Sequence, residues 1–158
     1  MNKDNKHLLQ AMHHAWQKQR NPSVPEHCIP LQKYNDNSAN ALTKSIIDFL
    51  KFSGFQAERI NTMGKRIDKT KLVDDVMGKR QIGTVGWIKG TGTKGSADIS
   101  ATIKGRSVKI EVKYGKDRQS EYQKAYQQSI EKAGGVYVIA KDFDTWIEWY
   151  YKYIKSII

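Results

Sequence analysis

The sequence predicts one domain of the α/β class, in which helices and strands follow one another along the chain. Three segments carry this prediction: an amphipathic helical pattern over residues 38–54, two alternating apolar runs over 98–113, and a helix–strand–helix pattern from residue 120 onward. With 158 residues, the chain is long enough for one hydrophobic core and too short for two.

The N-terminal segment predicts a helix over residues 5–19, because Leu8, Leu9, Met12 and Trp16 share one stripe at helical spacing. All three prolines of the chain follow shortly afterwards and break this helix. We therefore predict an N-terminal helical appendage with a proline-containing linker at 1–37, and a main domain at 38–158.

The main domain is predicted to begin with the helix over 38–54. The apolar residues of this helix fall near one face, and Gly54 is placed to end it. The following segment, FQAERIN at 55–61, predicts a strand.

The pattern weakens between residues 62 and 95, a segment with seven of the twelve glycines and eight basic residues. Short strands are predicted only near 72–77 and 84–88, with mobile basic loops between them. Trp87 lies near Lys89 and Lys94, which favours nucleic-acid contact because an aromatic ring beside cations can stack a base. A solvated polar connection is the alternative.

A β-hairpin is predicted from strands at 98–103 and 107–113. The two-residue period of a strand places the apolar residues of each run on one face. Asp98, Glu111 and Lys113 therefore share the opposite face.

Two registers of this hairpin are open. A turn at Lys104-Gly105 pairs Asp98 with Glu111, whereas a turn at Gly105-Arg106 pairs Asp98 with Lys113. Either register brings the two carboxylates within about 5–8 Å of each other.

Carboxylates at that distance repel each other unless a cation lies between them, and a divalent ion bound by oxygen ligands is the natural candidate. Such a site suits phosphodiester hydrolysis, in which the ion neutralises a phosphate oxygen and acidifies a water. Lys113 would orient that water or stabilise the developing charge. The alternative is an exposed hairpin face with ordinary cross-strand ion pairs.

The chain after the hairpin predicts a helix capped by Asp117 or Ser120, a buried strand at 136–140, and a last helix from about residue 142. The first of these helices carries an apolar stripe made by Tyr122, Ala125, Tyr126, Ile130 and Ala133. Ser120 and Gln123 have the spacing of a capping box, and one amide is not expected to serve both that box and the hairpin site.

The composition points to an anionic partner. The formal net charge is +11, which favours nucleic acid over neutral small molecules. The chain has no apolar run long enough to span a membrane and no apolar N-terminal leader, so we expect a cytoplasmic protein with no membrane partner.

Four short motifs together resemble the VRR-NUC branch of the PD-(D/E)xK nuclease superfamily. They are GSADI at 95–99, IEVK at 110–113, SEYQ at 120–123 and AGGVYVI at 133–139. The resemblance covers roughly residues 38–150. It implies a restriction-endonuclease-like core, which is a central mixed sheet flanked by helices, and a Mg²⁺ or Mn²⁺ cofactor.

The resemblance also implies an activity and its residues. The activity is metal-dependent cleavage of DNA, duplex or branched, at structures such as flaps and junctions. The implied catalytic residues are Asp98, Glu111, Lys113 and Gln123, and the implied metal ligands are Asp98, Glu111 and Val112. Small stand-alone chains of this kind resemble those of phages or mobile elements. Both a monomer and a homo-oligomer are compatible with the sequence.

Five residues are expected to bind nucleic acid. Arg59 and Asn61 belong to RINTMG at 59–64, which resembles the strand that these nucleases place after their first helix. Lys94 lies before the hairpin, and Lys116 and Arg118 lie just ahead of the next helix. The last two form either phosphate contacts or a solvated turn.

One departure from the family pattern concerns the first core helix, where the family usually has a glutamate that helps to hold the metal. Here Asn40 is the nearest polar residue, and no glutamate occurs between Glu26 and Glu58. This departure favours an alternative function, a catalytically weak or inactive nucleic-acid-binding module of the same fold. A basic RNA-associated protein is a third reading, but it does not explain the four ordered site residues.

Overall fold

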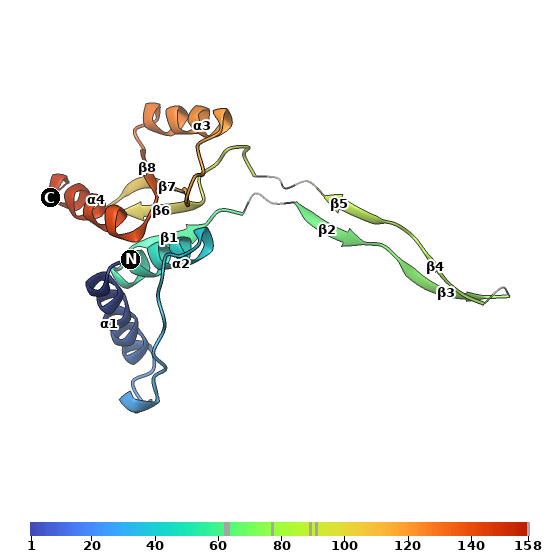
Figure 1. Cartoon of the computed structure of the whole chain (residues 1–158), viewed down its shortest axis with the longest axis horizontal. Helices are drawn as coiled ribbons and strands as arrows, with labels where there is room; N and C mark the ends of the chain where they lie inside the picture. Colours follow the sequence, from blue (N-terminus) through green and yellow to red (C-terminus); the bar gives the residue numbers. More distant parts are fainter. Residues whose placement is uncertain (62–63, 77, 89, 91, 158) are drawn as a thin grey trace.

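A four-stranded mixed sheet forms the centre of the main body in the computed structural model, which describes residues 1–61, 64–76, 78–88, 90 and 92–157 (Figure 1). Its strand order is β1–β6–β7–β8, with β7 and β8 parallel and the other pairs antiparallel. The strands are β1 (Gln56–Arg59), β6 (Ile99–Ile103), β7 (Arg106–Val112) and β8 (Val136–Ala140). Helices pack against this sheet, which confirms the predicted α/β class with a mixed sheet.

The predicted hairpin is formed by β6 and β7. Ile99 pairs with Ile110, and Ile103 pairs with Arg106, so the two turn residues are Lys104 and Gly105. Their φ angles are 49° and 78°, and two positive φ angles in a row are typical of the type I′ turn that suits a two-residue hairpin. Of the two predicted registers, this is the one that places Asp98 opposite Glu111.

Two helices of the main domain have the predicted limits and buried faces. Helix α2 (Ala39–Phe52) starts at Ser38, whose side chain accepts a hydrogen bond from the amide of Ala41. Helix α4 (Phe143–Ser156) starts at Asp142, which caps it in the same way. Their apolar faces meet in the core, and the buried residues of the two helices include Leu42, Ile46, Phe49, Leu50, Phe143, Trp146, Ile147 and Tyr150.

Helix α1 (Lys3–Arg20) packs against α2, and a short 3₁₀ helix (Glu26–Cys28) follows it. Leu9 is fully buried in the same hydrophobic core as α2, and Leu8 and Met12 pack against that core. The predicted helix is therefore present, whereas the boundary at residue 37 stays a prediction. None of the helices in the described ranges is both long and apolar enough to cross a lipid bilayer.

Helix α3 (Glu121–Lys132) forms where predicted, and its apolar stripe is only partly covered. Tyr122 is 55% exposed, and Tyr126 and Ile130 are only half-buried. The strand β8 is likewise half-buried along most of its length rather than fully buried. The reason is that β8 lies at the edge of the sheet, so α3, which packs on β8, is covered on one side only.

The segment after β1 forms a long two-stranded ribbon that projects away from the body (Figure 1). Its strands are β2 (Lys65–Asp68), β3 (Lys71–Asp75), β4 (Gly78–Ile82) and β5 (Val85–Ile88). The prediction of two short strands with loops between them was therefore wrong, since β2 and β4 are strands as well. Thr62, Met63, Met77 and Lys89, which belong to the predicted basic segment, lie outside the described residues.

Candidate active site

The two acids of the hairpin lie side by side at the end of the sheet. Asp98 is the residue before β6 and is half-buried, whereas Glu111 lies in β7 and is only 1% exposed. Oδ2 of Asp98 accepts a hydrogen bond from the backbone amide of Val112 over 2.9 Å. Because this bond comes from the neighbouring strand, it fixes the Asp98 carboxylate next to the strand that carries the second acid.

Lys113 brings a positive charge directly to this pair. Its Nζ lies 2.9 Å from Oε1 of Glu111 and 3.3 Å from Oδ2 of Asp117. The amide of Lys113 donates to the carbonyl of Ala140 on β8 over 2.8 Å, so the parallel strand holds the backbone that carries the lysine. The side chain of Lys113 is only 7% exposed, and its ammonium is therefore screened from bulk water.

The burial of this group shifts its protonation equilibria. Burial raises the pKa of Glu111, and the nearby Asp98 charge raises it further, while hydrogen bonds from Lys113 and Tyr137 act in the opposite direction. For Lys113, burial alone would lower the pKa, but the hydrogen bonds and attraction from Glu111 and Asp117 outweigh it and raise the pKa. The lysine therefore stays charged at neutral pH.

The side chain of Gln123 contacts the start of helix α3 and the charged residues of the hairpin at the same time. Its Oε1 accepts from the amide of Ser120 over 2.9 Å and from Nζ of Lys113 over 3.0 Å. Its Nε2 donates to Oε1 of Glu111. The expectation that one amide could not serve the cap and the site was wrong, because an amide has two lone pairs on oxygen and two N–H donors on nitrogen.

The loop before Asp98 packs against the start of α3. Gly95 has a φ of +80°, and a Cβ on it would lie 2.5 Å from the backbone carbonyl oxygen of Tyr122, so only glycine fits here. Next to it, Nζ of Lys94 lies 3.5 Å from the ring centroid of Tyr122. This cation–π pair holds Lys94, one of the predicted nucleic-acid residues, on the exposed ring of Tyr122, the residue before Gln123.

The other predicted nucleic-acid residues are all exposed, and they differ in how close they lie to Lys113. Arg59 ends β1 and donates to Oδ1 of Asn40 over 2.8 Å. Asn61 follows it toward the ribbon. Arg118 lines a pocket next to Lys113, whereas Lys116 is not one of its lining residues.

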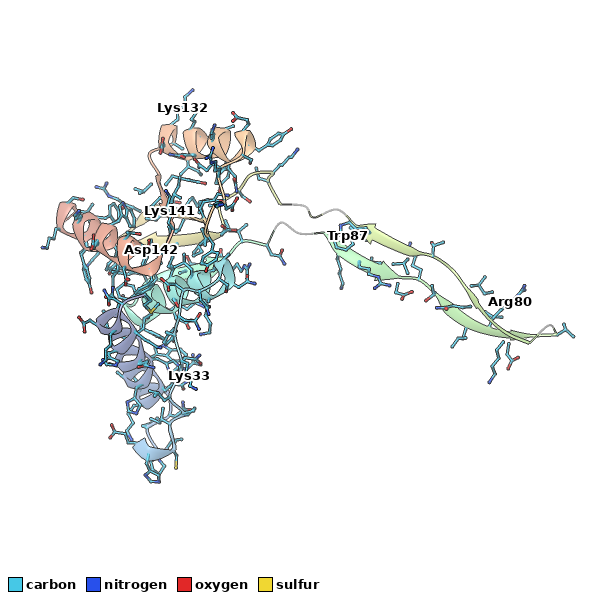
Figure 2. The ribbon with its side chains drawn as sticks, in the orientation of Figure 1. Lys33, Arg80, Trp87, Lys132, Lys141 and Asp142 are labelled. Atoms are coloured by element: carbon cyan, nitrogen blue, oxygen red, sulfur yellow. The ribbon has the colours of Figure 1, made fainter. Side chains whose placement is uncertain are left out.

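Sequence reasoning missed several residues of the site. The hydroxyl of Tyr137 lies 3.4 Å from Oε2 of Glu111, and burial, together with the negative charge of Glu111, raises the pKa of this phenol. Lys124 and Lys141 line the same pocket as Arg118, and Figure 2 shows Lys141 close to Asp142, at the start of the last helix. Alternation along β8 could have indicated Tyr137, but only the pairing of β8 with β7 brings it to Glu111.

Two acids that precede or belong to α2 do not supply the missing helix carboxylate. Asp36 accepts from the amino group of Met1 and from the amide of Phe143, and Asp48 pairs with Lys44 and accepts from the hydroxyl of Tyr34. Both carboxylates are therefore engaged elsewhere.

The donor set fits a hard divalent cation. Magnesium is usually bound by one or two carboxylates together with substrate phosphate and water, and Asp98 and Glu111 supply two carboxylates side by side. Within the described ranges, no group of three or more His, Cys, Asp or Glu side chains is arranged to hold a metal. Any further ligands at this site would come from the backbone around Val112, from water or from the substrate.

No known protein family, characterised protein or solved structure matches this chain.

Proposed function

We propose that this protein is a divalent-metal-dependent DNA endonuclease of the VRR-NUC type, selective for branched structures such as flaps or junctions. The observation that carries the proposal is the cluster of Asp98, Glu111, Lys113 and Gln123, which three separate parts of the chain bring together. Two acids that can hold a divalent ion, with a lysine beside them, suit metal-assisted phosphodiester hydrolysis.

Each side chain has a distinct task in this proposal. Asp98 and Glu111 would hold Mg²⁺ or Mn²⁺, which polarises the scissile phosphate and lowers the pKa of a bound water. Lys113 carries the positive charge that orients the attacking water and stabilises charge developing on the phosphate. Gln123 holds the lysine and the glutamate in position through its two hydrogen bonds.

The surrounding charges support a nucleic-acid substrate. Arg118, Lys124 and Lys141 line the pocket on one side of Lys113, and Lys94 lies beyond Gln123. A phosphate backbone that crosses the site would meet cations on both sides of the scissile bond.

The proposal is tested with supercoiled plasmid, a flap and a four-way junction, incubated with Mg²⁺ or Mn²⁺ and with or without a chelator. We expect cutting that requires the metal and that is lost in Asp98→Asn and Glu111→Gln. Glu148→Gln is the matched control, because Glu148 is an exposed carboxylate on α4 and does not belong to the cluster. Cutting that persists in the chelator, or that survives in both site variants, would overturn the proposal.

A second function, a nucleic-acid-binding module with weak or no catalysis, is favoured by one observation. The position nearest to the expected helix glutamate is Asn40, and its side-chain oxygen accepts a hydrogen bond from Arg59. The same assay separates the two functions, since the binding module would bind DNA in the chelator and fail to cut it with either metal.

A further inference from the structure

The ribbon that leaves the body is one continuous element. Two residues separate β2 from β3 and two separate β4 from β5, so both strand pairs share one register. The amide of Lys69 donates to the carbonyl of Thr84 across the gap between them, over 3.2 Å. From Lys65 to Asp75 each strand has eleven positions, which at about 3.3 Å per residue gives an arm about 36 Å long.

The described strands of this arm pair with one another, and the ribbon projects away from the body (Figure 1). Every residue of β4 and β5 is exposed, and the exposed side chains include Leu72 at 80% and Trp87 at 65%. Figure 2 shows Trp87 near the base of the ribbon and Arg80 farther out along it. A lone two-stranded ribbon is marginally stable in water, so an arm of this length is expected to work against a surface that covers it.

Charge decides which surface that is. The segment 64–88 has six lysine or arginine residues and three aspartates, and the whole chain has a formal net charge of +11. A second copy of the chain would bring the same excess of positive charge to the arm and repel it, whereas a polyanion would be attracted. The exposed side chains of the arm include cations, such as Lys65 and Lys71, and apolar groups, such as Leu72, a combination that suits phosphates beside sugars and base edges.

The dimensions also match a DNA groove. The major groove of B-DNA, about 12 Å wide, admits a two-stranded β-ribbon. An arm of about 36 Å is as long as one helical turn of about 34–36 Å.

The arm starts next to the candidate active site. The amide of Ile60, the residue after β1, donates to the carbonyl of Asp98 over 2.8 Å, and the chain then enters the ribbon. On its return, the chain passes Lys94 and Gly95 against α3 before it reaches Asp98. Residues that precede and follow the arm along the chain therefore lie next to the candidate site, Ile60 on the backbone of Asp98 and Lys94 on α3.

We propose that the ribbon at 65–88 lies in a groove of duplex DNA next to the cleavage point and selects substrates with a duplex arm of about one turn there. This inference rests on the proposed function for the identity of the substrate. It adds a second DNA-binding element, and it predicts a requirement on substrate length that the active site alone would not impose.

The test compares two quadruple variants of equal charge in a chelator, where no cutting occurs. In the ribbon variant Lys65, Lys69, Lys71 and Lys79 are changed to glutamine, and in the control variant Lys6, Lys132, Lys152 and Lys155, which are exposed on helices of the body, are changed in the same way. Affinity for branched DNA is measured between about 50 and 200 mM salt, where each phosphate contact contributes about 0.9 to the logarithmic salt slope.

We expect the ribbon variant to reduce the salt slope by up to about 3.6 and the affinity at least tenfold, and the control variant to change both far less. Shortening the duplex arm from about 30 to about 5 base pairs, half a helical turn, should weaken the wild-type protein and leave the ribbon variant unchanged. Equal losses in the two variants, or no dependence on arm length, would overturn the inference.

A second variant guards against misfolding of a charge-altered ribbon. Replacing residues 71–82 by Asn-Gly, a sequence that favours a two-residue hairpin turn, keeps the inner half of the arm and removes the outer half. This variant should retain the thermal stability of the body and require a shorter duplex arm. A wild-type dimer in sedimentation that this variant converts to a monomer would instead assign the ribbon to a second copy of the chain.

These outcomes separate the two proposals. If binding depends on the ribbon but no metal supports cutting, the proposed nuclease activity fails and the DNA-binding arm stands. If metal-dependent cutting is intact in the ribbon variant on every substrate length, the arm fails and the nuclease stands.

Discussion

The amide of Val112 donates a hydrogen bond to Oδ2 of Asp98 over 2.9 Å. Through this bond the backbone of β7 holds the carboxylate that precedes β6, at the same strand end as Glu111 and Lys113. The acid is therefore oriented before any cation or phosphate arrives, which is the condition for a site that works by positioning. It also explains how a short hairpin can hold two acids together without a long loop.

Lys113→Ala is expected to separate metal binding from cutting. Metal affinity should persist or rise, since a competing cation has been removed, while cutting should fall about 10²–10³-fold. In the absence of metal the variant leaves Glu111 buried without its ion-pair partner, so its stability should fall by about 3 kcal/mol or more. Calorimetric metal titration, nicking assays and thermal unfolding measure these three quantities.

Lys109→Ala is the control for that variant, because Lys109 lies on β7, the strand that leads into Lys113, and donates to Ser100 instead. It should change neither cutting nor metal affinity. Full-rate cutting by Lys113→Ala would remove the lysine from the mechanism.

The two roles of Gln123 can be separated with its capping partner. Ser120→Ala removes the cap and should cost about 1 kcal/mol of stability, with cutting nearly unchanged. Gln123→Ala should cost a similar amount and also reduce cutting at least tenfold, because Lys113 and Glu111 both lose a hydrogen bond. If the two variants cut equally well in nicking assays, Gln123 is only a helix cap.

Asn40→Glu restores a carboxylate at the first turn of α2. The variant should fold normally, because this position is exposed and a negative charge near a helix N-terminus is favourable. We expect cutting at lower metal concentrations than in the wild-type protein. Ala39→Glu is the matched control, since it adds the same charge to the same turn at a different angle around the helix. Equal metal dependence in the two variants would mean that α2 does not face the metal site.

Acid stability should depend on Asp144. Burial alone would raise its pKa, but hydrogen bonds from the side chain of Asn5 and the amide of Asn2, together with the amino group of Met1, lower it. A carboxyl with a lowered pKa in the folded state contributes stability above its unfolded pKa of about 3.9, and this contribution is lost as the pH falls further. Asp144→Asn should therefore have a lower melting temperature than wild type at pH 7, and the difference should shrink at pH 3. A difference that stays constant between these two pH values would contradict this linkage.

The sequence alone was sufficient for the elements whose signals are local. Ser38 and Gly54 delimit α2, and the two-residue period of the hairpin places Asp98, Glu111 and Lys113 on one face, as the structure has them. Local signals work here because one side of each element is buried, so its apolar residues repeat at the period of the helix or strand. The choice between the two hairpin registers was not local in this sense, and the pairing of Ile103 with Arg106 resolved it.

The tertiary structure decided what lies around those three residues. The parallel pairing of β8 with β7 brings Tyr137 to Glu111, and the packing of α3 brings Gln123 to both Glu111 and Lys113. These contacts join positions far apart in sequence, which no local period encodes. The ribbon is the opposite case. It projects from the body and its strands lack a regular alternation, so the sequence predicted only two of its four strands, and the pairing of the backbone shows the continuous ribbon.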